Sequence, residues 1–461
     1  MRAEAVDDSV LPVSWRRTMT RERVSALRVQ ILHQRRSRGS GIQLKGRMRF
    51  AIVDTTLTTA PTGGCQTFLE HLAPSLERRG HQVSIVTEPG DEPAVADRLQ
   101  RAGIRVLDDV WRRRFLPEER AHRLADWCKR ERIDAYVISV SRDVGWLALP
   151  HLDRATQTAA VVHTDGRAFY EPLAHYGVYV DHAIGVSRET CRNIPLLCGV
   201  PEARTRQIPY GIERLSEAQL TERLEDSGLP RTLEIAYIGR LVHSQKRVLD
   251  LALLGSELAE RNLPFVMHVI GAGEDASRLR EALAGAGIGS RVRWWGWLTP
   301  SDVRARLRQL DALVLPSEFE GLPLVLLEAM GHGVVPVATH IASGNAELVR
   351  NGENGFLVAV GDIQGFVARL EELHRDPALL IRLRRSAWTT TADYSVERMA
   401  SAYEASFSAP GVRAPRPLGQ FPVMPSCRSP YPTWLRRVKW LVSGVLAGVR
   451  RRLRHRVLDN R

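Results

Sequence analysis

The fold of this chain can be argued from the stretch Arg49-Phe-Ala-Ile-Val-Asp54, the glycine pair Gly63-Gly64 and the stretch Gln82-Val-Ser-Ile-Val-Thr87. The first and last of these are short apolar runs, which are typical of buried strands. Apolar residues recur between them with helical spacing, at Phe68, Leu69, Leu72 and Leu76. A strand, a helix and a second strand in this order predict a βαβ unit.

The same alternation of strand and helix patterns continues along the chain. Further short apolar runs predict strands at 104–107, 135–140, 158–163, 233–238, 265–270, 292–295, 312–315 and 334–338. A polar stretch at 215–231, rich in Glu, Arg and Ser, divides the series into two halves. Alternating strands and helices build parallel sheets with helices on both faces. The sequence therefore predicts two α/β domains, with the ligand held between them at the carboxyl ends of the strands.

The chain of 461 residues is long enough for two or three domains. We expect a first domain at 48–211, a second at 212–390 and a closing helix at 391–408. Seven prolines between 410 and 432 predict an extended linker at 409–433. Residues 1–47 are expected to be a basic, disordered leader, and 434–461 a separate basic tail.

The net charge of +13 is carried by the two ends of the chain. Residues 1–47 hold 11 basic and 4 acidic side chains, and residues 409–461 hold 12 basic and 1 acidic, which leaves −5 for the body. A mildly acidic body argues against nucleic-acid binding and favours ends that contact an anionic surface. Five scattered cysteines without metal-site spacing indicate a reducing compartment. No apolar run reaches the roughly 18 residues of a membrane span.

The tail has the pattern of an amphipathic helix. Its apolar residues follow helical spacing, with basic residues between them, at Trp434, Val438, Leu441, Val442, Val445, Val449, Leu453 and Val457. Such a helix can lie in the surface of an anionic membrane through residues 434–458. Packing of the helix on the body is the alternative. The sequence predicts a cytoplasmic protein, with peripheral attachment to the inner face of the membrane as an open possibility.

Two glutamates stand after the predicted strand 312–315. Glu320 lies in the loop that follows this strand, Pro323 suits the first turn of the next helix, and Glu328 lies about two turns further on. Free amides at the start of that helix favour negative charge and hydroxyl oxygens. Two carboxylates there can accept hydrogen bonds from the vicinal hydroxyls of a sugar or ribose. The alternative is that both are ordinary glutamates on an exposed helix face.

This stretch resembles the Glu-x7-Glu motif of family 4 glycosyltransferases with the GT-B fold, which has two facing Rossmann-like parallel-sheet domains. The resemblance covers about residues 48–408, and its motifs occur in the family's order. They are Gly63-Gly64, Gly80-His81, His163, 184–187, 208–211, 237–241 followed by Lys246, Gly271 and Gly273, 351–357, and Gly361-Asp362.

The resemblance implies a retaining enzyme that moves a sugar from a nucleoside-diphosphate sugar to a glycan or lipid-linked acceptor, such as a cell-surface polysaccharide precursor. It assigns catalytic roles to His163, Arg240, Lys246 and Glu320. It assigns donor binding to Gly239, Arg240, Lys246, Gly271, Gly273, Glu320, Gly321, Leu322, Pro323, Leu324 and Glu328. The Gly63-Gly64 loop would approach the acceptor or a phosphate. An arginine fork and a lysine charge after a strand suit a diphosphate, although a single basic residue is more often a solvated surface charge.

No Asp-x-Asp signature follows a strand in the body, which is in keeping with the resemblance to GT-B enzymes that need no divalent ion for the leaving group. The resemblance therefore implies no bound metal and no cofactor besides the sugar-nucleotide substrate. The chain departs from the family pattern at Tyr210, where many relatives carry Asn, and at 343–345, which read Ser-Gly-Asn where a Gly-Gly pair is frequent. A non-catalytic sugar-nucleotide binder of the same fold, acting as a regulator of polysaccharide assembly, is the alternative function. An epimerase or a phosphorylase of this fold is a further alternative.

Overall fold

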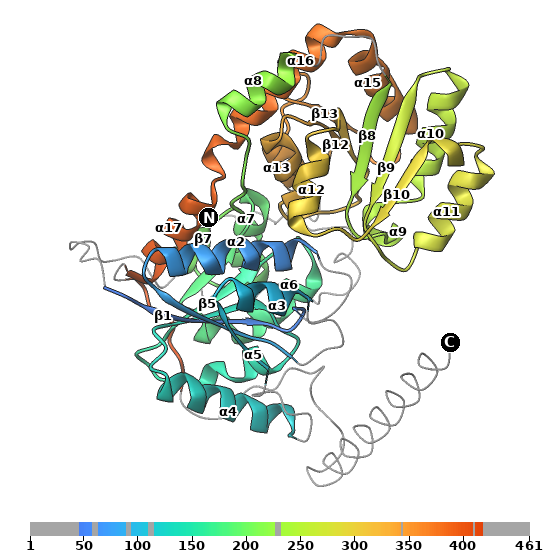
Figure 1. Cartoon of the computed structure of the whole chain (residues 1–461). Helices are drawn as coiled ribbons and strands as arrows, with labels where there is room; N and C mark the ends of the chain where they lie inside the picture. The colour runs from blue at the N-terminus through green and yellow to red at the C-terminus, as the bar shows by residue number, and fades with distance from the viewer. Residues whose placement is uncertain are drawn as a thin grey trace, which may run out of the picture.

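The computed structural model describes residues 46–57, 63–88, 94–108, 115–225, 232–342, 344–408 and 411–417. Within these residues the chain forms two parallel sheets in two lobes, each sheet flanked by helices (Figure 1). The strand orders are β3-β2-β1-β4-β5-β6-β7 and β10-β9-β8-β11-β12-β13. The predicted class, two Rossmann-like α/β domains, is confirmed.

The first sheet is built mainly from apolar runs. Its strands are β1 (Arg49–Asp54), β2 (Gln82–Val86), β3 (Arg105–Leu107), β4 (Ala135–Val140), β5 (Gln157–Val162), β6 (His182–Gly185) and β7 (Thr205–Gln207). Its helices are α2 (Gly64–Arg78), α3 (Ala94–Arg101), α4 (Pro117–Arg130), α5 (Val144–Leu147), α6 (Arg167–Tyr176) and α7 (Arg188–Cys198). The strands β6 and β7 were not predicted, because β6 is short and the three residues of β7 are polar.

The second domain repeats the arrangement. Its strands are β8 (Leu233–Ile238), β9 (Phe265–Ile270), β10 (Val292–Gly296), β11 (Ala312–Leu315), β12 (Val335–Thr339) and β13 (Phe356–Val358). Its helices are α9 (His243–Lys246), α10 (Asp250–Glu260), α11 (Ala276–Gly285), α12 (Pro300–Leu307), α13 (Leu324–Gly331), α14 (Gly344–Leu348), α15 (Ile363–Arg375) and α16 (Pro377–Thr390). The polar stretch between the two sheets contains the helix α8 (Glu217–Glu225), which buries Leu220 and Leu224.

The last described helix, α17 (Val396–Ser408), returns the chain to the first domain and packs beside α2 (Figure 1). The ring of Phe407 meets the ring of Phe50 edge-on, with centroids 5.5 Å apart. Arg79, which caps the end of α2, forms an ion pair with Glu404 of α17. One continuous apolar cluster contains residues of both sheets and of α17. The packing of α17 therefore connects the second domain to the first.

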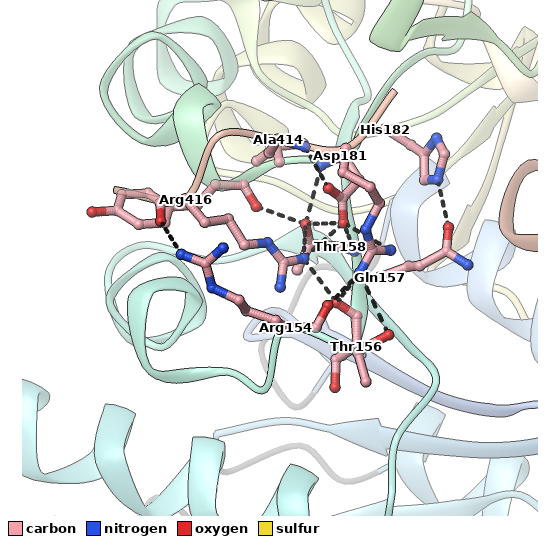
Figure 2. Close-up of polar contacts among 12 residues, drawn as sticks. Arg154, Thr156, Gln157, Thr158, Asp181, His182, Ala414 and Arg416 are labelled. Carbon is pink, nitrogen blue, oxygen red and sulfur yellow. Dashed lines mark hydrogen bonds and ion pairs between the residues drawn. The ribbon is translucent and has the colours of Figure 1, made fainter. Parts of the chain in front are cut away.

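Residues 411–417, within the proline-rich segment expected to be a linker, pack on the first domain (Figure 2). Arg416 donates hydrogen bonds to the Asp181 carboxylate, at 2.7 Å, and to the Thr156 carbonyl, at 2.8 Å. The backbone amide of Ala414 donates to the other oxygen of Asp181. This part of the segment is therefore an anchored part of the domain. Proline content alone could not predict it, because the partner residues lie more than 200 positions away.

The expected leader and the amphipathic tail at 434–461 lie outside the described residues, apart from positions 46 and 47. Among the helices that the structure describes, none is both long enough and apolar enough to cross a bilayer.

Candidate functional site

Loops from both domains meet at the carboxyl ends of the strands. An antiparallel bridge joins Thr164, which follows β5, to Gly321, which follows β11. A Cβ atom placed on Gly64 would lie 3.8 Å from Cβ of Leu324, at the start of α13. A Cβ atom on Gly63 would lie 4.0 Å from Cδ of Arg240, which follows β8. Ligands of open α/β sheets bind at this position.

Gly321 is the residue at which the two backbones come closest. A side chain there would collide with the carbonyl oxygen of His163 and with Cα of Thr164. Glycine is required because only hydrogen occupies that space. The contact places Glu320, the preceding residue, directly beside the first domain.

Glu320 is fixed by two donors. Its Oε1 atom lies 2.5 Å from Nζ of Lys246 and accepts a 2.6 Å hydrogen bond from Oγ of Ser317. Only 5% of Glu320 is exposed. Hydrogen bonds to a charged group are among the stronger ones, so the carboxylate and the ammonium hold each other in place. Two predicted site residues, Lys246 and Glu320, are therefore brought together, and Ser317 joins them without having been predicted.

Gln245 connects the Arg240 loop to the Glu320 loop. Its side-chain oxygen accepts from Arg240 at 2.7 Å, and its side-chain amide donates to the carbonyl of Phe319 at 3.3 Å. Its backbone carbonyl accepts from the amide of Glu318 at 2.8 Å. No sequence signal singled out Gln245, because its role depends on two loops that are distant in sequence.

The glycines after β8 and β9 shape the loop that carries Arg240. Gly239 and Gly271 have φ angles of +156° and +141°, which other residues rarely adopt. A side chain on Gly271 would overlap the carbonyl of Gly239, and one on Gly273 would overlap the backbone of Leu241. The backbones of the two loops are therefore in contact. Gly271 and Gly273 pack on Gly239 and Leu241, the two neighbours of Arg240, and so hold the Arg240 loop in place.

Glu328 lies on α13 and is 8% exposed. Burial raises the pKa of its carboxyl to about 7, while Arg304 lowers it and Glu213 raises it to a smaller extent. Because Glu320 and Glu328 are both buried, the alternative of two ordinary exposed glutamates is excluded. A carboxyl of this kind takes its charged form readily when a ligand donates hydrogen bonds to it.

The start of α13 differs slightly from expectation. Pro323 occupies the N-cap position, and Leu324 is the first helical residue. Leu322 and Leu324 are buried in the shared apolar cluster. The unpaired amides of the first turn therefore begin one residue later than predicted, next to the loop that carries Glu320.

His163 is buried, and both its ring nitrogens are already hydrogen-bonded inside the protein. Nδ1 lies 2.7 Å from the hydroxyl of Tyr210, and Nε2 lies 3.0 Å from Oγ of Ser139. Burial lowers the pKa of the imidazole to about 3, so the ring is neutral. A catalytic hydrogen bond from this ring to a sugar hydroxyl would require one of these contacts to break.

The assembled groups suit a phosphorylated sugar. Arg240 and Lys246 supply positive charge, the α13 amides supply donors, and Glu320 and Glu328 supply acceptors. Within the described ranges no cluster of three metal-ligating side chains occurs.

Two family models match the chain in succession. The model described as Glycosyltransferase Family 4 matches residues 62–214, and the model described as Glycosyl transferases group 1 matches residues 232–376. A lipopolysaccharide 1,6-galactosyltransferase of Salmonella typhimurium is 36% identical over 140 residues, or 30% of this chain and 38% of the relative. The lipopolysaccharide core biosynthesis glycosyltransferase LpsE of Rhizobium meliloti is 34% identical over 147 residues, or 32% of this chain and 42% of the relative.

These matches span about two fifths of the length of the curated relatives. Solved structures match over a greater length. The Anabaena HepE protein, solved with UDP and glucose, has a TM-score of 0.63 and 16% identity over 79% of this chain and 100% of that one. The lipopolysaccharide outer core galactosyltransferase WaaB has a TM-score of 0.56 and 18% identity over 78% and 99%. With both domains matched by glycosyltransferase models and the whole body matched by GT-B structures, the chain belongs to the family 4-like glycosyltransferases with the GT-B fold.

Proposed function

We propose that this protein is a retaining glycosyltransferase that moves a sugar from a nucleoside-diphosphate sugar to a glycan or lipid-linked precursor of a cell-surface polysaccharide. The observation that carries the proposal is the pair of Lys246 and Glu320, held at 2.5 Å beside the first domain, with Arg240 linked to the same loops through Gln245. This arrangement places two cations and a fixed carboxylate together. A sugar diphosphate needs both kinds of group.

Each residue has a distinct task in this proposal. Arg240 and Lys246 bind the diphosphate and stabilise the negative charge that develops as it leaves, helped by the first-turn amides of α13. Glu320 accepts hydrogen bonds from the transferred sugar, and Glu328 accepts them from the ribose. No metal ion is needed to hold the leaving group, because the protein supplies the positive charge.

The reaction keeps the configuration of the sugar. The acceptor hydroxyl approaches the anomeric carbon on the face from which the diphosphate departs. The bond from the anomeric carbon to the phosphate oxygen breaks as the bond to the acceptor oxygen forms, and a phosphate oxygen takes the hydroxyl proton. The Gly63-Gly64 loop faces Arg240 from the first domain, so it would border the diphosphate or the acceptor.

The acceptor class is suggested by the relatives, several of which are named for lipopolysaccharide biosynthesis and one for colanic acid biosynthesis. Precursors of such polymers are bound to membrane lipids in many cases, and the basic pattern of residues 434–458 would bring the protein to the inner face of the membrane. These residues lie outside the described structure, so this contact stays a prediction from the sequence.

A donor screen tests the proposal. The full chain is incubated with UDP-, GDP- and ADP-sugars, and slow hydrolysis and thermal stabilisation are measured. One donor should be hydrolysed and should stabilise the protein, and Lys246→Ala should lose both effects. Lys129→Ala is the matched control, because Lys129 lies exposed on α4, away from the site. Donor binding without any turnover, even with added acceptor glycans, would favour the non-catalytic binder instead.

A further inference from the structure

A chain of buried hydrogen bonds lies behind the site. It runs from the hydroxyl of Tyr210 to Nδ1 of His163, from Nε2 of His163 to Oγ of Ser139, and from Oγ of Ser139 to Oδ2 of Asp54, over 2.7, 3.0 and 2.8 Å. The four residues are each at most 5% exposed. They come from the end of β1, from β4 and from the segments after β5 and β7, so the chain crosses the first sheet near its carboxyl edge.

The carboxylate form of Asp54 fixes the direction of these hydrogen bonds. Burial raises the pKa of Asp54, while the hydrogen bonds from Thr56 and Ser139 lower it and favour the carboxylate. Asp54 accepts from the amide and hydroxyl of Thr56 on Oδ1, at 2.9 and 2.6 Å, and from Ser139 on Oδ2. Because the hydroxyl hydrogen of Ser139 goes to Asp54, its oxygen is left to accept from Nε2–H of His163. Nδ1 of His163 then carries no hydrogen and accepts from Tyr210.

The surroundings favour this neutral form of the ring. Phe68 and Phe169 meet the imidazole edge-on, with centroids at 5.1 and 5.8 Å, and Tyr210 stacks on it at 5.9 Å. No described residue forms an ion pair with His163. A charged imidazole would therefore be buried among aromatic rings without a counter-charge in contact.

This chain of hydrogen bonds reaches residues of the site from its Asp54 end and from His163. At one end, the side-chain amide of Gln66 donates to the carbonyl and hydroxyl of Thr56, and its oxygen accepts from the amide of Gly63 at 2.6 Å. At His163, the backbone carbonyl is the atom that leaves room only for glycine at position 321. The chain thus links the Gly63 loop to the contact that positions Glu320.

We propose that Tyr210, Ser139 and Asp54 are positioning residues, which lock His163 in its Nε2-protonated form and so hold the His163–Thr164 backbone against Gly321. The imidazole thereby supports the donor site from inside the first domain. The expected effect on sugar transfer rests on the proposed function, whereas the state of the ring does not. Tyr210 stands where many relatives carry Asn. In this protein its hydroxyl donates to Nδ1 of His163 and so keeps that nitrogen unprotonated.

The state of the ring can be read by NMR on the full chain carrying ¹⁵N-labelled histidine, with His163 assigned through His163→Gln. The proposal predicts a protonated Nε2 and a bare, hydrogen-bonded Nδ1. Tyr210→Phe should shift the Nδ1 signal downfield by several ppm as the donor is lost. Tyr403→Phe is the matched control, because the hydroxyl of Tyr403 is buried beside the same Phe68 and has no partner among the described residues. A proton on Nδ1, or equal spectra of the two variants, would overturn the proposal.

Kinetic measurements on Tyr210→Phe and Tyr403→Phe distinguish an effect on the positioning of the site from an effect on the stability of the fold. Tyr210→Phe should lower kcat roughly five- to tenfold, as expected for the loss of one hydrogen bond, with the donor KM and the melting temperature close to those of Tyr403→Phe. Equal kcat values would contradict the positioning role. If the wild-type chain transfers no sugar, the proposed function fails while the NMR result still decides the state of His163.

Discussion

Arg416 and Asp181 form a buried ion pair at 2.7 Å although 235 positions separate them in the sequence. Arg416 also donates to the carbonyls of Asp153 and Thr156 (Figure 2). Asp181 lies just before β6, and Thr156 just before β5, so the pair sits at the amino ends of these strands. This is the edge of the sheet opposite to the candidate site, which lies beyond their carboxyl ends. Residues 411–417 are therefore fixed at the far side of the first domain from the candidate site.

Arg416→Ala should destabilise the first domain by about 3 to 5 kcal/mol, because it leaves the carboxylate of Asp181 buried without its closest charged partner. Arg413→Ala is the control. Arg413 lies 3.4 Å from the same carboxylate but its side chain is 39% exposed, so its loss should cost under about 1 kcal/mol. Urea unfolding followed by tryptophan fluorescence measures both. Equal effects would show that the pair is not an anchor.

Two C-terminal truncations that differ by nine residues should differ in melting temperature. A chain ending at Pro417 keeps the anchor and should melt with the full chain, whereas a chain ending at Ser408 lacks it and should melt several degrees lower. Both should lose binding to anionic vesicles in a sedimentation assay if the tail makes the membrane contact. Unchanged vesicle binding by the Pro417 chain would place that contact elsewhere.

Binding of a nucleoside diphosphate should release a proton through Glu328. Because its pKa is raised to about 7 by burial, the free protein at pH 6.5 holds this carboxyl mostly protonated. Ribose hydroxyls that donate to it favour the charged form and lower the pKa, so roughly half a proton or more should leave for each nucleotide bound. Calorimetry in buffers of different ionisation enthalpy measures this release. Glu328→Gln should remove it, and identical release by that variant would exclude the ribose role.

The raised pKa of Glu328 also predicts how the stability of the fold changes with pH. A folded pKa above the ordinary value of 4.5 means that the stability associated with Glu328 is fully present below about pH 4.5 and is lost as the pH rises through about 7. Wild type should therefore lose stability relative to Glu328→Gln between pH 5 and pH 8. Denaturant unfolding of the pair across this range is the check, and a constant difference would contradict the raised pKa.

Loss of a diphosphate contact should weaken donor binding. Arg240→Ala and Lys246→Ala should each raise the donor Kd roughly tenfold to more than a hundredfold, as charge-assisted hydrogen bonds contribute about 1.5 to 3 kcal/mol. Glu320→Gln should instead damage transfer while nucleotide affinity changes little, since Glu320 is assigned to the sugar. Fluorescence titration with the nucleotide separates these cases. Wild-type affinity in both cation variants would remove the diphosphate assignment.

Treatment with EDTA should leave transfer intact, because Arg240, Lys246 and the amides of α13 are proposed to neutralise the leaving group. The assay compares initial rates before and after chelation. A complete loss that magnesium restores would show that an ion is required.

The sequence predicted most of the fold because the central strands are short apolar runs, and burial requires that pattern. It missed β6, β7 and β13, which are short, and α8, whose few apolar residues lie in a polar stretch. It predicted Lys246 and Glu320 as site residues, but not that they pair with each other. The roles of Gln245, Ser139 and Asp54 were not predictable, because each depends on contacts between loops that only the folded chain brings together.

The most direct test of the central claim is the anomeric configuration of the product. The full chain is given the sugar nucleotide that it hydrolyses and an acceptor glycan, and the new linkage is read from the proton coupling constant of its anomeric centre. A linkage with the same configuration as the donor sugar is the predicted result. A linkage of the opposite configuration, or no transfer to any acceptor from any of the UDP-, GDP- and ADP-sugars, would contradict the account of a retaining transferase built around Lys246 and Glu320.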